Sequence, residues 1–355
     1  MDFNLDETQQ DLKKLAAEVL AREGDEERLW QAGLMGVCVP EEAGGAGLGP
    51  VEMAVVLREV GARAAPVPAL PTLAGTLALA RHGSPDQQRR TTGRVTLALR
   101  EPGHDLADPP TTTARLADPP TTTRLADAPA TAAGPAGPPA TADRPGSAGG
   151  RWVLNGRKVS VPHPGAVALV TADEGLFLVA SPATTAEFAS TGEPAATMVL
   201  DDTPAEHVAG PEAVEDARRI FTAAVAAQAS GVLAGALELT TGYIRQRRQF
   251  GRALAEFQAV TMQIADVYIA GRALDVAMWS AVWRLGEGLP AEQDLALAAY
   301  HVGEAVKALY TCQHLHGGLG LDVTYPLHRY FAQAKHLSHL LGGADAQLDL
   351  IGALV

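Results

Sequence analysis

The residues best suited to chemistry in this chain are four arginines that lie within eight positions. The segment Arg245–Arg252 reads RQRRQFGR and ends a long apolar, periodic stretch that predicts a helix. Guanidinium groups bind phosphates and carboxylates through paired hydrogen bonds, and cations also stabilise a helix C-terminus. Taken alone, a solvated helix end explains the segment better than an anion site does.

A second candidate is the segment Gln313–Gly320, which reads QHLHGGLG. Three glycines in four residues allow a backbone or a ligand to approach closely. The segment is neither a Walker loop nor a GxGxxG fingerprint, so a helix C-cap turn is the simpler interpretation. Histidines His314, His316 and His328 do not predict a metal site, because side chains two positions apart on a helix diverge and no cysteine or carboxylate cluster completes the set.

Composition excludes several classes of protein. A formal net charge of −13 argues against nucleic acid as a partner, because phosphate binding requires clustered Lys and Arg. Only two cysteines occur, Cys38 and Cys312, so neither a disulfide framework nor a cysteine-rich zinc site is expected. No uninterrupted apolar run of about 18 residues suggests a membrane span, and the acidic N-terminus lacks the features of a signal peptide. We therefore expect a cytoplasmic protein that does not contact membranes.

The order of patterns predicts an α+β fold that is mostly α. Residues 1–95 read as a helical domain, with amphipathic periodicity at 6–22, 52–62 and 70–81. Short β-branched or alternating runs predict a small β-domain over 96–205. Residues 211–355 form long periodic stretches joined by short loops, which is typical of an antiparallel helix bundle; the expected helices span 214–245, 254–287 and 290–314.

A low-complexity insertion is expected inside the β-domain, at about 107–150. It is rich in Pro, Thr and Ala, and RLADPPTTT at 115–123 repeats LADPPTTT at 106–113. Such residues bury too little apolar surface to offset the entropy of ordering. Repeat slippage in a tolerant loop explains this segment better than a docking function does.

Five motifs follow one another along the chain: PEEAGGAGLGPVEMAVVLREVG at 40–61, REPG at 100–103, LNGRKV at 154–159, RRQFGRALAEFQ at 247–258 and LHGGLGLDVTYPLHRYF at 315–331. Taken in order, they resemble the acyl-CoA dehydrogenase family, and with the N-terminal helix they cover nearly the whole chain. The C-terminal motifs are most similar to the actinobacterial subfamily that shortens steroid side chains, whose members are obligate α2β2 heteromers of two related subunits. The resemblance implies the acyl-CoA dehydrogenase fold and FAD as cofactor.

The resemblance also says where a catalytic base should lie. In the family a glutamate removes the α-proton of an acyl-CoA while hydride leaves the β-carbon for the flavin. One family position for this glutamate aligns with Leu341, and the other aligns with Phe221, beside Thr222. None of these side chains can accept a proton. Asp345 and Glu215 are possible substitutes, but each requires the register to slip by a helical turn or more.

The flavin contacts divide into an altered half and a retained half. Where the family has a Thr before Glu-Pro-Gly, this chain has Arg100, and where it has Trp-x-Thr, this chain has Ser160, Val161 and Pro162. The subunit's own flavin site is thus expected to be damaged. The residues that the family donates to the neighbouring subunit's flavin are retained: Arg247, Phe250, Gln258, Gly317, Gly318 and either Gln313 or His314.

We therefore expect a subunit that lacks the catalytic base and completes the flavin site of a partner. The partner would be a homologous subunit that carries the glutamate, the substrate would be an acyl-CoA, and the electrons would pass to an electron-transfer flavoprotein or another acceptor. A steroid acyl group rests on the resemblance alone. Two alternatives stay open: a homomeric dehydrogenase that uses Asp345 or Glu215 as its base, and a catalytically inactive scaffold without flavin.

Overall fold

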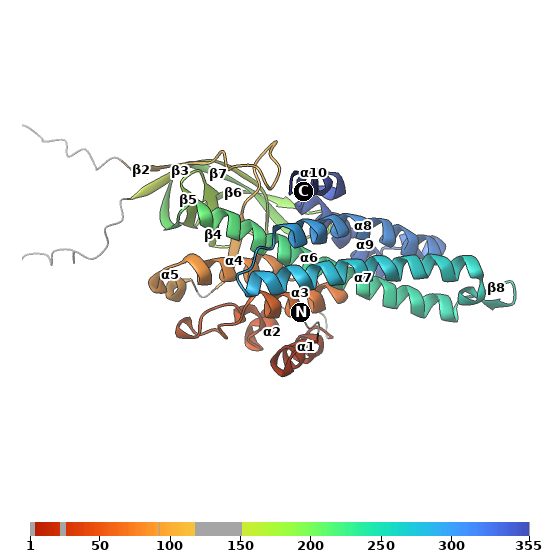
Figure 1. Cartoon of the computed structure of the whole chain (residues 1–355). Coiled ribbons are helices and arrows are strands. Elements are labelled where there is room, and N and C mark those ends of the chain that lie inside the picture. The colour runs from red at the N-terminus through yellow and green to blue at the C-terminus, as the bar shows by residue number, and fades with distance from the viewer. Residues whose placement is uncertain (1–3, 22–25, 92, 118–150, 355) are drawn as a thin grey trace, which may run out of the picture.

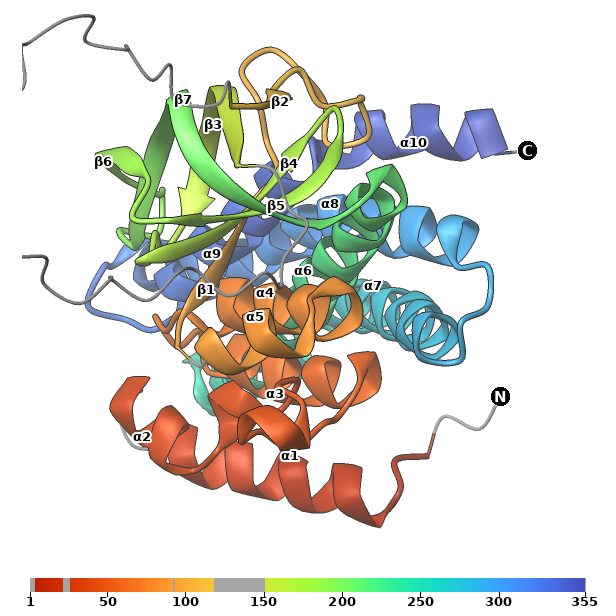
Figure 2. The ribbon, with the colours of Figure 1, turned by 90° about the vertical axis from the view of Figure 1, so that its left-hand side faces the viewer.

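The computed structural model describes residues 4–21, 26–91, 93–117 and 151–354. Its first part is a set of helices that lies below the rest of the molecule in Figure 2. Helix α1 begins at a capping box in which Asp6 and Gln9 exchange hydrogen bonds, as the acidic, amphipathic sequence there favours. The helices of this part are α1 (Glu7–Leu20), α2 (Glu26–Gln31), α3 (Pro50–Ala62), α4 (Ala69–His82) and α5 (Pro85–Arg90).

A seven-stranded sheet follows and covers the helices on one side (Figures 1 and 2). Its order is β1-β4-β5-β7-β3-β2, with β6 paired to β7, and only the β1–β4 pair is parallel. Register shifts in the β3–β7 pair bend the sheet around its own apolar core. The strands are β1 (Val95–Ala98), β2 (Thr113–Leu116), β3 (Trp152–Pro162), β4 (Val167–Ala172), β5 (Gly175–Ala180), β6 (Ala183–Phe188) and β7 (Pro194–Ala209).

The first part of the predicted insertion at about 107–150 contains a strand, where irregular structure was expected. Thr113–Leu116 form strand β2, which pairs antiparallel with β3. The backbone N–H of Ala114 donates to the Asp173 carboxylate at 2.8 Å, and Arg115 pairs with Asp202 at 2.8 Å. These partners order a sequence that composition alone suggested was irregular. The remainder of the predicted insertion, 118–150, lies outside the described residues.

The last part is the helix bundle, whose long helices run side by side in Figure 1. The predicted helix at 254–287 starts later than expected, because Leu254–Glu256 form a 3₁₀ turn before α7. A two-stranded hairpin at the far end of the bundle joins α6 to α7 (Figure 1). The elements are α6 (Pro211–Gln246), β8 (Arg248–Gln249), β9 (Arg252–Ala253), α7 (Gln258–Gly286), α8 (Glu292–His316), α9 (Leu327–Leu340) and α10 (Gly343–Leu354).

Helix α6 is the centre of the fold. It also bears on the expectation, made from sequence, that the chain has no segment able to span a membrane. Among the described residues it is the one helix long and apolar enough to cross a bilayer by length and composition. However, 83% of its most apolar window is buried inside the protein. It is surrounded by α3, α4, α7, α8 and α9. Its apolar character is therefore explained by its place in the core.

Three glycines allow α3 and α6 to touch backbone to backbone. A Cβ on Gly231 would lie 1.9 Å from the carbonyl oxygen of Arg58, and one on Gly61 would lie 2.0 Å from that of Gln228. One on Gly235 would lie 2.2 Å from the carbonyl oxygen of Ala62. Only hydrogen fits at these positions, so the crossing fixes the height of α6 relative to the N-terminal helices.

Replacing Gly231 by Ala should therefore destabilise the protein, since the new methyl group meets backbone that cannot move alone. We expect a loss of about 1–3 kcal/mol or more in the free energy of unfolding. The matched control is Gly242→Ala on the same helix, where no described atom lies within 4 Å of the added carbon. There Ala should be neutral or stabilise by about 0.5–1 kcal/mol. Urea unfolding of both variants measures the difference, and equal effects would contradict the close-packing argument.

Candidate functional site: an exposed surface and a narrow cavity

The arginine-rich segment forms the hairpin of β8 and β9. Its turn residues Phe250 and Gly251 have φ angles of 50° and 80°, as a two-residue hairpin with positive φ at both positions requires. The turn exposes 93% of Phe250. The guanidinium of Arg252 lies 4.0 Å from the centre of the Phe257 ring, a cation–π contact that fixes the base of the hairpin.

Arg247 and Gln258 flank this hairpin. The backbone N–H of Arg247 donates to the Tyr243 carbonyl at 2.8 Å and closes α6, while its side chain is exposed. Gln258 begins α7 and is also exposed. Both side chains are thus free to face a ligand or another chain at the end of the bundle.

The glycine-rich segment is a C-cap followed by a 3₁₀ turn. Gly317 ends α8 with φ 60° and ψ −138°, a conformation that side chains rarely adopt. Among described atoms, none lies within 4 Å of a Cβ built on Gly317 or Gly318. His314 is exposed, whereas Gln313 is half-buried and donates to the Gly320 carbonyl at 3.2 Å. The turn therefore presents open backbone next to His314.

The structure brings the two segments together. The rings of Tyr243 and His316 stack with centres 4.3 Å apart, although the residues are 73 positions apart in sequence. The Tyr243 hydroxyl also donates to the His316 carbonyl at 3.4 Å. Arg247 follows Tyr243 by one helical turn, and Gly317 follows His316 directly. The segments picked out from sequence thus contribute to one surface.

The two positions expected for a catalytic glutamate are apolar and buried. Leu341 lies at the C-terminus of α9, is 2% exposed and precedes Gly342 and Gly343, whose φ angles are 81° and 82°. Phe221 is buried in the core of α6. Neither position offers a group that could exchange a proton.

The two possible substitutes for the catalytic glutamate, Asp345 and Glu215, are exposed at the surface. Asp345 is an exposed residue in the first turn of α10. Glu215 has a 57% exposed side chain that forms an ion pair with Arg218 at 2.7 Å. Each carboxylate thus lies at the surface, where water solvates it.

A narrow cavity separates the sheet from α4, α6 and α9, next to Pro162. Its volume is about 30 Å³, and its walls include Pro162, His163, Glu193 and Leu340. That is room for about one water molecule, whereas cofactor sites measure roughly 300–1,000 Å³. The cavity beside Pro162 is therefore too small to hold a cofactor.

Two of the residues that line this cavity, His163 and Glu193, contact each other. His163 Nε2 lies 3.3 Å from Glu193 Oε1 and links the end of β3 to the loop before β7. Burial alone would raise the pKa of Glu193, but hydrogen bonds from His163 and Thr191 bring that pKa below its ordinary value. Burial lowers the pKa of neighbouring His336. The carboxylate thus stays ionised and keeps its histidine partner.

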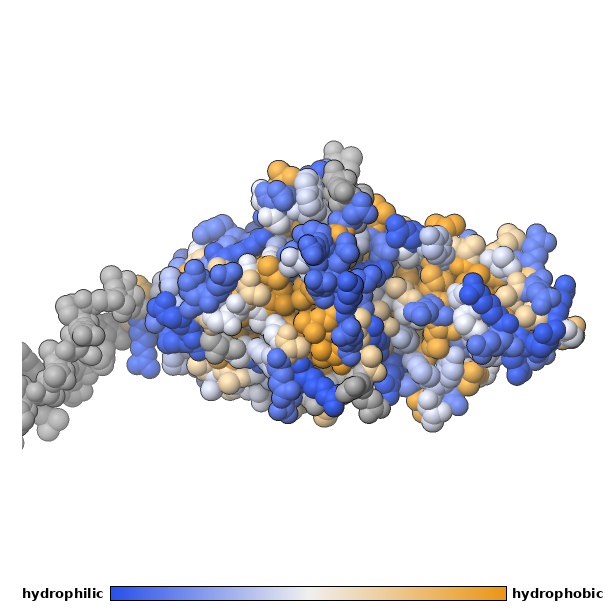
Figure 3. Space-filling view, turned by 90° about the horizontal axis from the view of Figure 1, so that it is seen from below, coloured by the Kyte–Doolittle hydropathy of each residue, from blue (hydrophilic) through white to orange (hydrophobic). Residues whose placement is uncertain are grey.

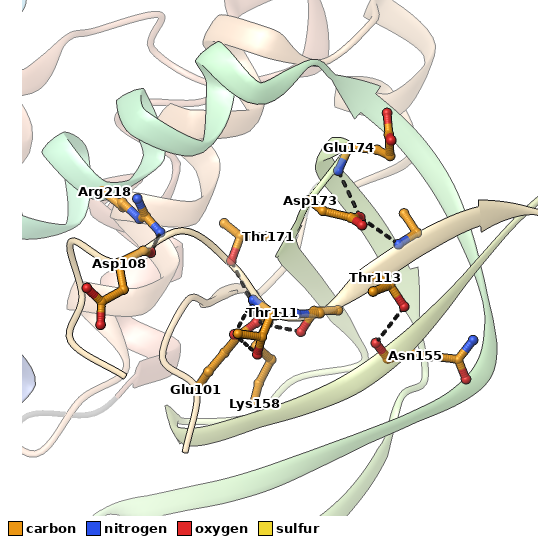
Figure 4. Close-up of polar contacts among 12 residues, drawn as sticks. Glu101, Asp108, Thr111, Thr113, Asn155, Lys158, Thr171, Asp173, Glu174 and Arg218 are labelled. Atoms are coloured by element: carbon orange, nitrogen blue, oxygen red, sulfur yellow. Dashed lines mark hydrogen bonds and ion pairs between the residues drawn. The ribbon is translucent and has the colours of Figure 1, made fainter. Parts of the chain in front are cut away.

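Arg100 stands beside this cavity region on a loop held by a buried ion pair. Burial lowers the pKa of Arg100, and its carbonyl accepts from Val159 N–H at 3.0 Å. The next residue, Glu101, accepts from Lys158 Nζ at 2.5 Å, and both side chains are almost fully buried. Figure 4 shows Lys158 directed at Glu101 and Thr171.

Glu101 also fastens the start of strand β2. Its carboxylate accepts hydrogen bonds from the backbone N–H and the hydroxyl group of both Thr111 and Thr112 (Figure 4). Burial raises the pKa of Glu101, but the bonds from Lys158 and the threonines outweigh it and lower that pKa to about 2. Burial, partly offset by Glu101, lowers the pKa of Lys158 to about 8.

Sequence reasoning missed two contacts, the Glu101–Lys158 ion pair and the His163–Glu193 hydrogen bond. The first lies within the REPG and LNGRKV motifs, which we had read only for flavin contacts. A lysine within an otherwise apolar strand was the available signal, because buried lysines require a partner. Nothing local in the sequence links His163 to Glu193, which are 30 positions apart.

Removing one charge of the Glu101–Lys158 pair should be far more harmful than removing both. Glu101→Gln leaves a buried ammonium without its counter-charge, and we expect a loss of about 3–5 kcal/mol in the free energy of unfolding. The double variant Glu101→Gln, Lys158→Met should recover a large part of that loss. Chemical unfolding of the wild type, Glu101→Gln, Lys158→Met and the double variant measures the coupling; simple additivity would contradict it.

The same pair predicts sensitivity to acid. The folded-state pKa of Glu101 is about 2, below its ordinary value of 4.5, so its contribution to stability is present above pH 4.5. That contribution should be lost as the pH falls from 4.5 towards 2. The midpoint of urea unfolding across this range should fall more steeply for the wild type than for the double variant. Equal slopes would show that Glu101 titrates alike in both states.

Comparison with known proteins identifies the class. The family model for the acyl-CoA dehydrogenase N-terminal domain matches residues 6–96, and the model for its C-terminal domain matches residues 218–355. The chain belongs to the acyl-CoA dehydrogenase family, and it has that family's fold. This confirms the predicted fold class and the resemblance.

Individual members of the family are similar to this chain over nearly its whole length. Acyl-CoA dehydrogenase FadE28 of Mycobacterium tuberculosis is 36% identical, over 99% of this chain and 98% of that protein. FadE27 of the same organism is 31% identical over the same shares. Among solved structures, the Tcur3481-Tcur3483 steroid ACAD G363A variant matches with a TM-score of 0.83 and 34% identity, over 98% of this chain and 97% of that one. The ChsE4-ChsE5 complex from M. tuberculosis matches with a TM-score of 0.82 and 29% identity, over 99% and 98%.

Proposed function

We propose that this chain is the subunit of an FAD-dependent acyl-CoA dehydrogenase that lacks the catalytic base and completes the flavin site of a homologous partner. The observation that carries the proposal is the contrast between an exposed surface and a small cavity. The residues that would contact a partner's flavin are exposed and share one end of the bundle, whereas the cavity beside Pro162, a residue that the resemblance assigns to the chain's own flavin contacts, measures about 30 Å³.

The exposed surface fits the phosphate-bearing part of FAD. Arg247 supplies a permanently charged donor fork, and Gln258 supplies an amide. Gly317 and Gly318 leave their backbone uncovered, so that a pyrophosphate can come close. FAD, when bound, accepts the hydride that desaturation removes from the acyl chain. This chain's part in that reaction is to hold the cofactor.

The proton-abstracting role belongs to the partner in this proposal. A general base must lie within about 3 Å of the proton it removes, so a carboxylate has to reach the reacting carbon. Leu341 and Phe221 occupy the two positions from which the family does so. Asp345 and Glu215 are exposed at the surface, away from both of these positions in the sequence.

The surface of α7 supports association with another chain. Met262, Ile269 and Val276 recur every seven residues and are 61%, 63% and 47% exposed. This spacing places them on one face of the helix, and Figure 3 shows apolar side chains gathered along the bundle. Exposed apolar faces of this kind mark contacts between proteins. We propose that the covering chain is the homologous subunit, in an α2β2 assembly.

The substrate we propose is the CoA thioester of a steroid side chain. Support comes from a structural relative described as a steroid ACAD, which shares 34% identity over 98% of this chain. An electron-transfer flavoprotein or another acceptor would reoxidise the flavin. We place the enzyme in the cytoplasm. A homomeric dehydrogenase with Asp345 or Glu215 as base is the second candidate.

Flavin counting in the co-expressed assembly tests the proposal. We expect one FAD for each pair of subunits, and Arg247→Ala in this chain should release it, because the guanidinium no longer pairs with the phosphates. The matched control is Arg219→Ala on the same helix, whose side chain pairs with Glu292 at the surface. This control should retain the flavin. Absorbance of the bound cofactor gives the count.

Three outcomes would contradict the proposal. A full complement of flavin that survives Arg247→Ala would mean that this chain holds its own cofactor. Loss of turnover in Asp345→Asn or Glu215→Gln, with assembly and flavin unchanged, would make that carboxylate the base and favour the homomeric enzyme. A colourless assembly would favour a scaffold.

A further inference from the structure

His316 is a buried polar residue at the point where the two halves of the exposed surface meet. Its side chain belongs to the last turn of α8, and the residue is only 3% exposed. The Tyr243 ring stacks on it at 4.3 Å, and the Tyr325 ring lies 5.3 Å away at a tilt of 52°. Three segments of the chain, from α6, α8 and the turn before α9, thus converge on one imidazole.

The hydrogen bonds of this imidazole define its protonation. Nδ1 lies 2.8 Å from the carbonyl oxygen of Cys312, which can only accept, so Nδ1 carries a hydrogen. Nε2 lies 3.2 Å from the Tyr325 hydroxyl, which donates to it when the ring is neutral. Burial lowers the pKa of His316, which favours this neutral form. Both ring nitrogens are therefore satisfied.

The contacts of His316 continue into the cofactor surface on both sides. On one side Gly317 follows directly, and the His316 carbonyl accepts from the Tyr243 hydroxyl. On the other side the Tyr243 carbonyl accepts from the N–H of Arg247 at 2.8 Å. The distance between the arginine and the glycine turn is thus set by two aromatic rings and their hydrogen bonds.

We propose that His316 is a positioning residue for the flavin phosphates, which holds the Gly317–Gly318 turn and the end of α6 in one fixed relation. The inference rests on the proposed function of this surface. An apolar ring would fill the same space, but it could not hold α8 and the Tyr325 turn through directed bonds. A fully satisfied buried network selects a single arrangement of its parts, as a phosphate site made of separate segments requires.

The test uses the co-expressed assembly and its affinity for FAD. His316→Phe keeps a ring between the tyrosines and removes both side-chain hydrogen bonds. We expect the Kd for FAD to rise about tenfold, the equivalent of about 1.4 kcal/mol. His316→Asn, which can restore a donor at the place of Nδ1, should recover part of the affinity. The matched control is His301→Phe on the same helix, beside Tyr300, and it should leave the Kd unchanged.

The Kd and the thermal stability of the flavin-free assembly are measured on the same variants. A lower melting temperature with an unaltered Kd in His316→Phe would overturn the proposal, because His316 would then serve the fold alone. Failure of His316→Asn to recover any affinity would also overturn it. If the wild-type assembly binds FAD independently of Arg247, the proposed function itself fails, and this outcome is distinct from the other two.

Discussion

The contact between α3 and α6 is the constraint on which the rest of the molecule depends. At Gly61, Gly231 and Gly235 the two backbones touch without side chains between them, so α6 has one permitted height against the N-terminal helices. Because α6 is 36 residues long and continuous, a position fixed in its middle is transmitted to both ends. One end carries Phe221 near the sheet, and the other carries Arg247 at the hairpin. The packed core and the proposed cofactor surface thus share one continuous helix.

The two regions compared above differ in whether their charged groups are paired. At the end of the bundle, Arg247 keeps its charge in water, and the polar groups that organise the site are neutral, with Tyr243 and His316 bonded to backbone. Next to the sheet, charged groups are paired with each other, as in Glu101–Lys158. A site that pairs its own charges has little left to offer a ligand. A site that leaves them free attracts an anion and steers its approach.

Much of this could be predicted from sequence, and the exceptions have physical reasons. The long helices follow from apolar periodicity, and the RRQFGR and HGGLG segments were recognised because their residue types are locally unusual. Strand β2 was missed, because its order depends on Asp173 and Asp202, which lie far away in sequence. The contact between His163 and Glu193 was missed for the same reason. His316 was weighed only as a metal ligand, since its tyrosine partners are distant in the chain.

The buried pair of Glu101 and Lys158 has a consequence for how such a subunit can arise. The loop that carries Arg100 keeps its shape through contacts made entirely within the polypeptide, so this shape does not depend on a bound cofactor. Substitutions at Arg100 or Pro162 can therefore accumulate without unravelling the sheet. A duplicated subunit built in this way is free to abandon its own chemistry while remaining a well-folded neighbour. Because this ion pair holds the loop, the fold can be retained in evolution even when the activity is lost.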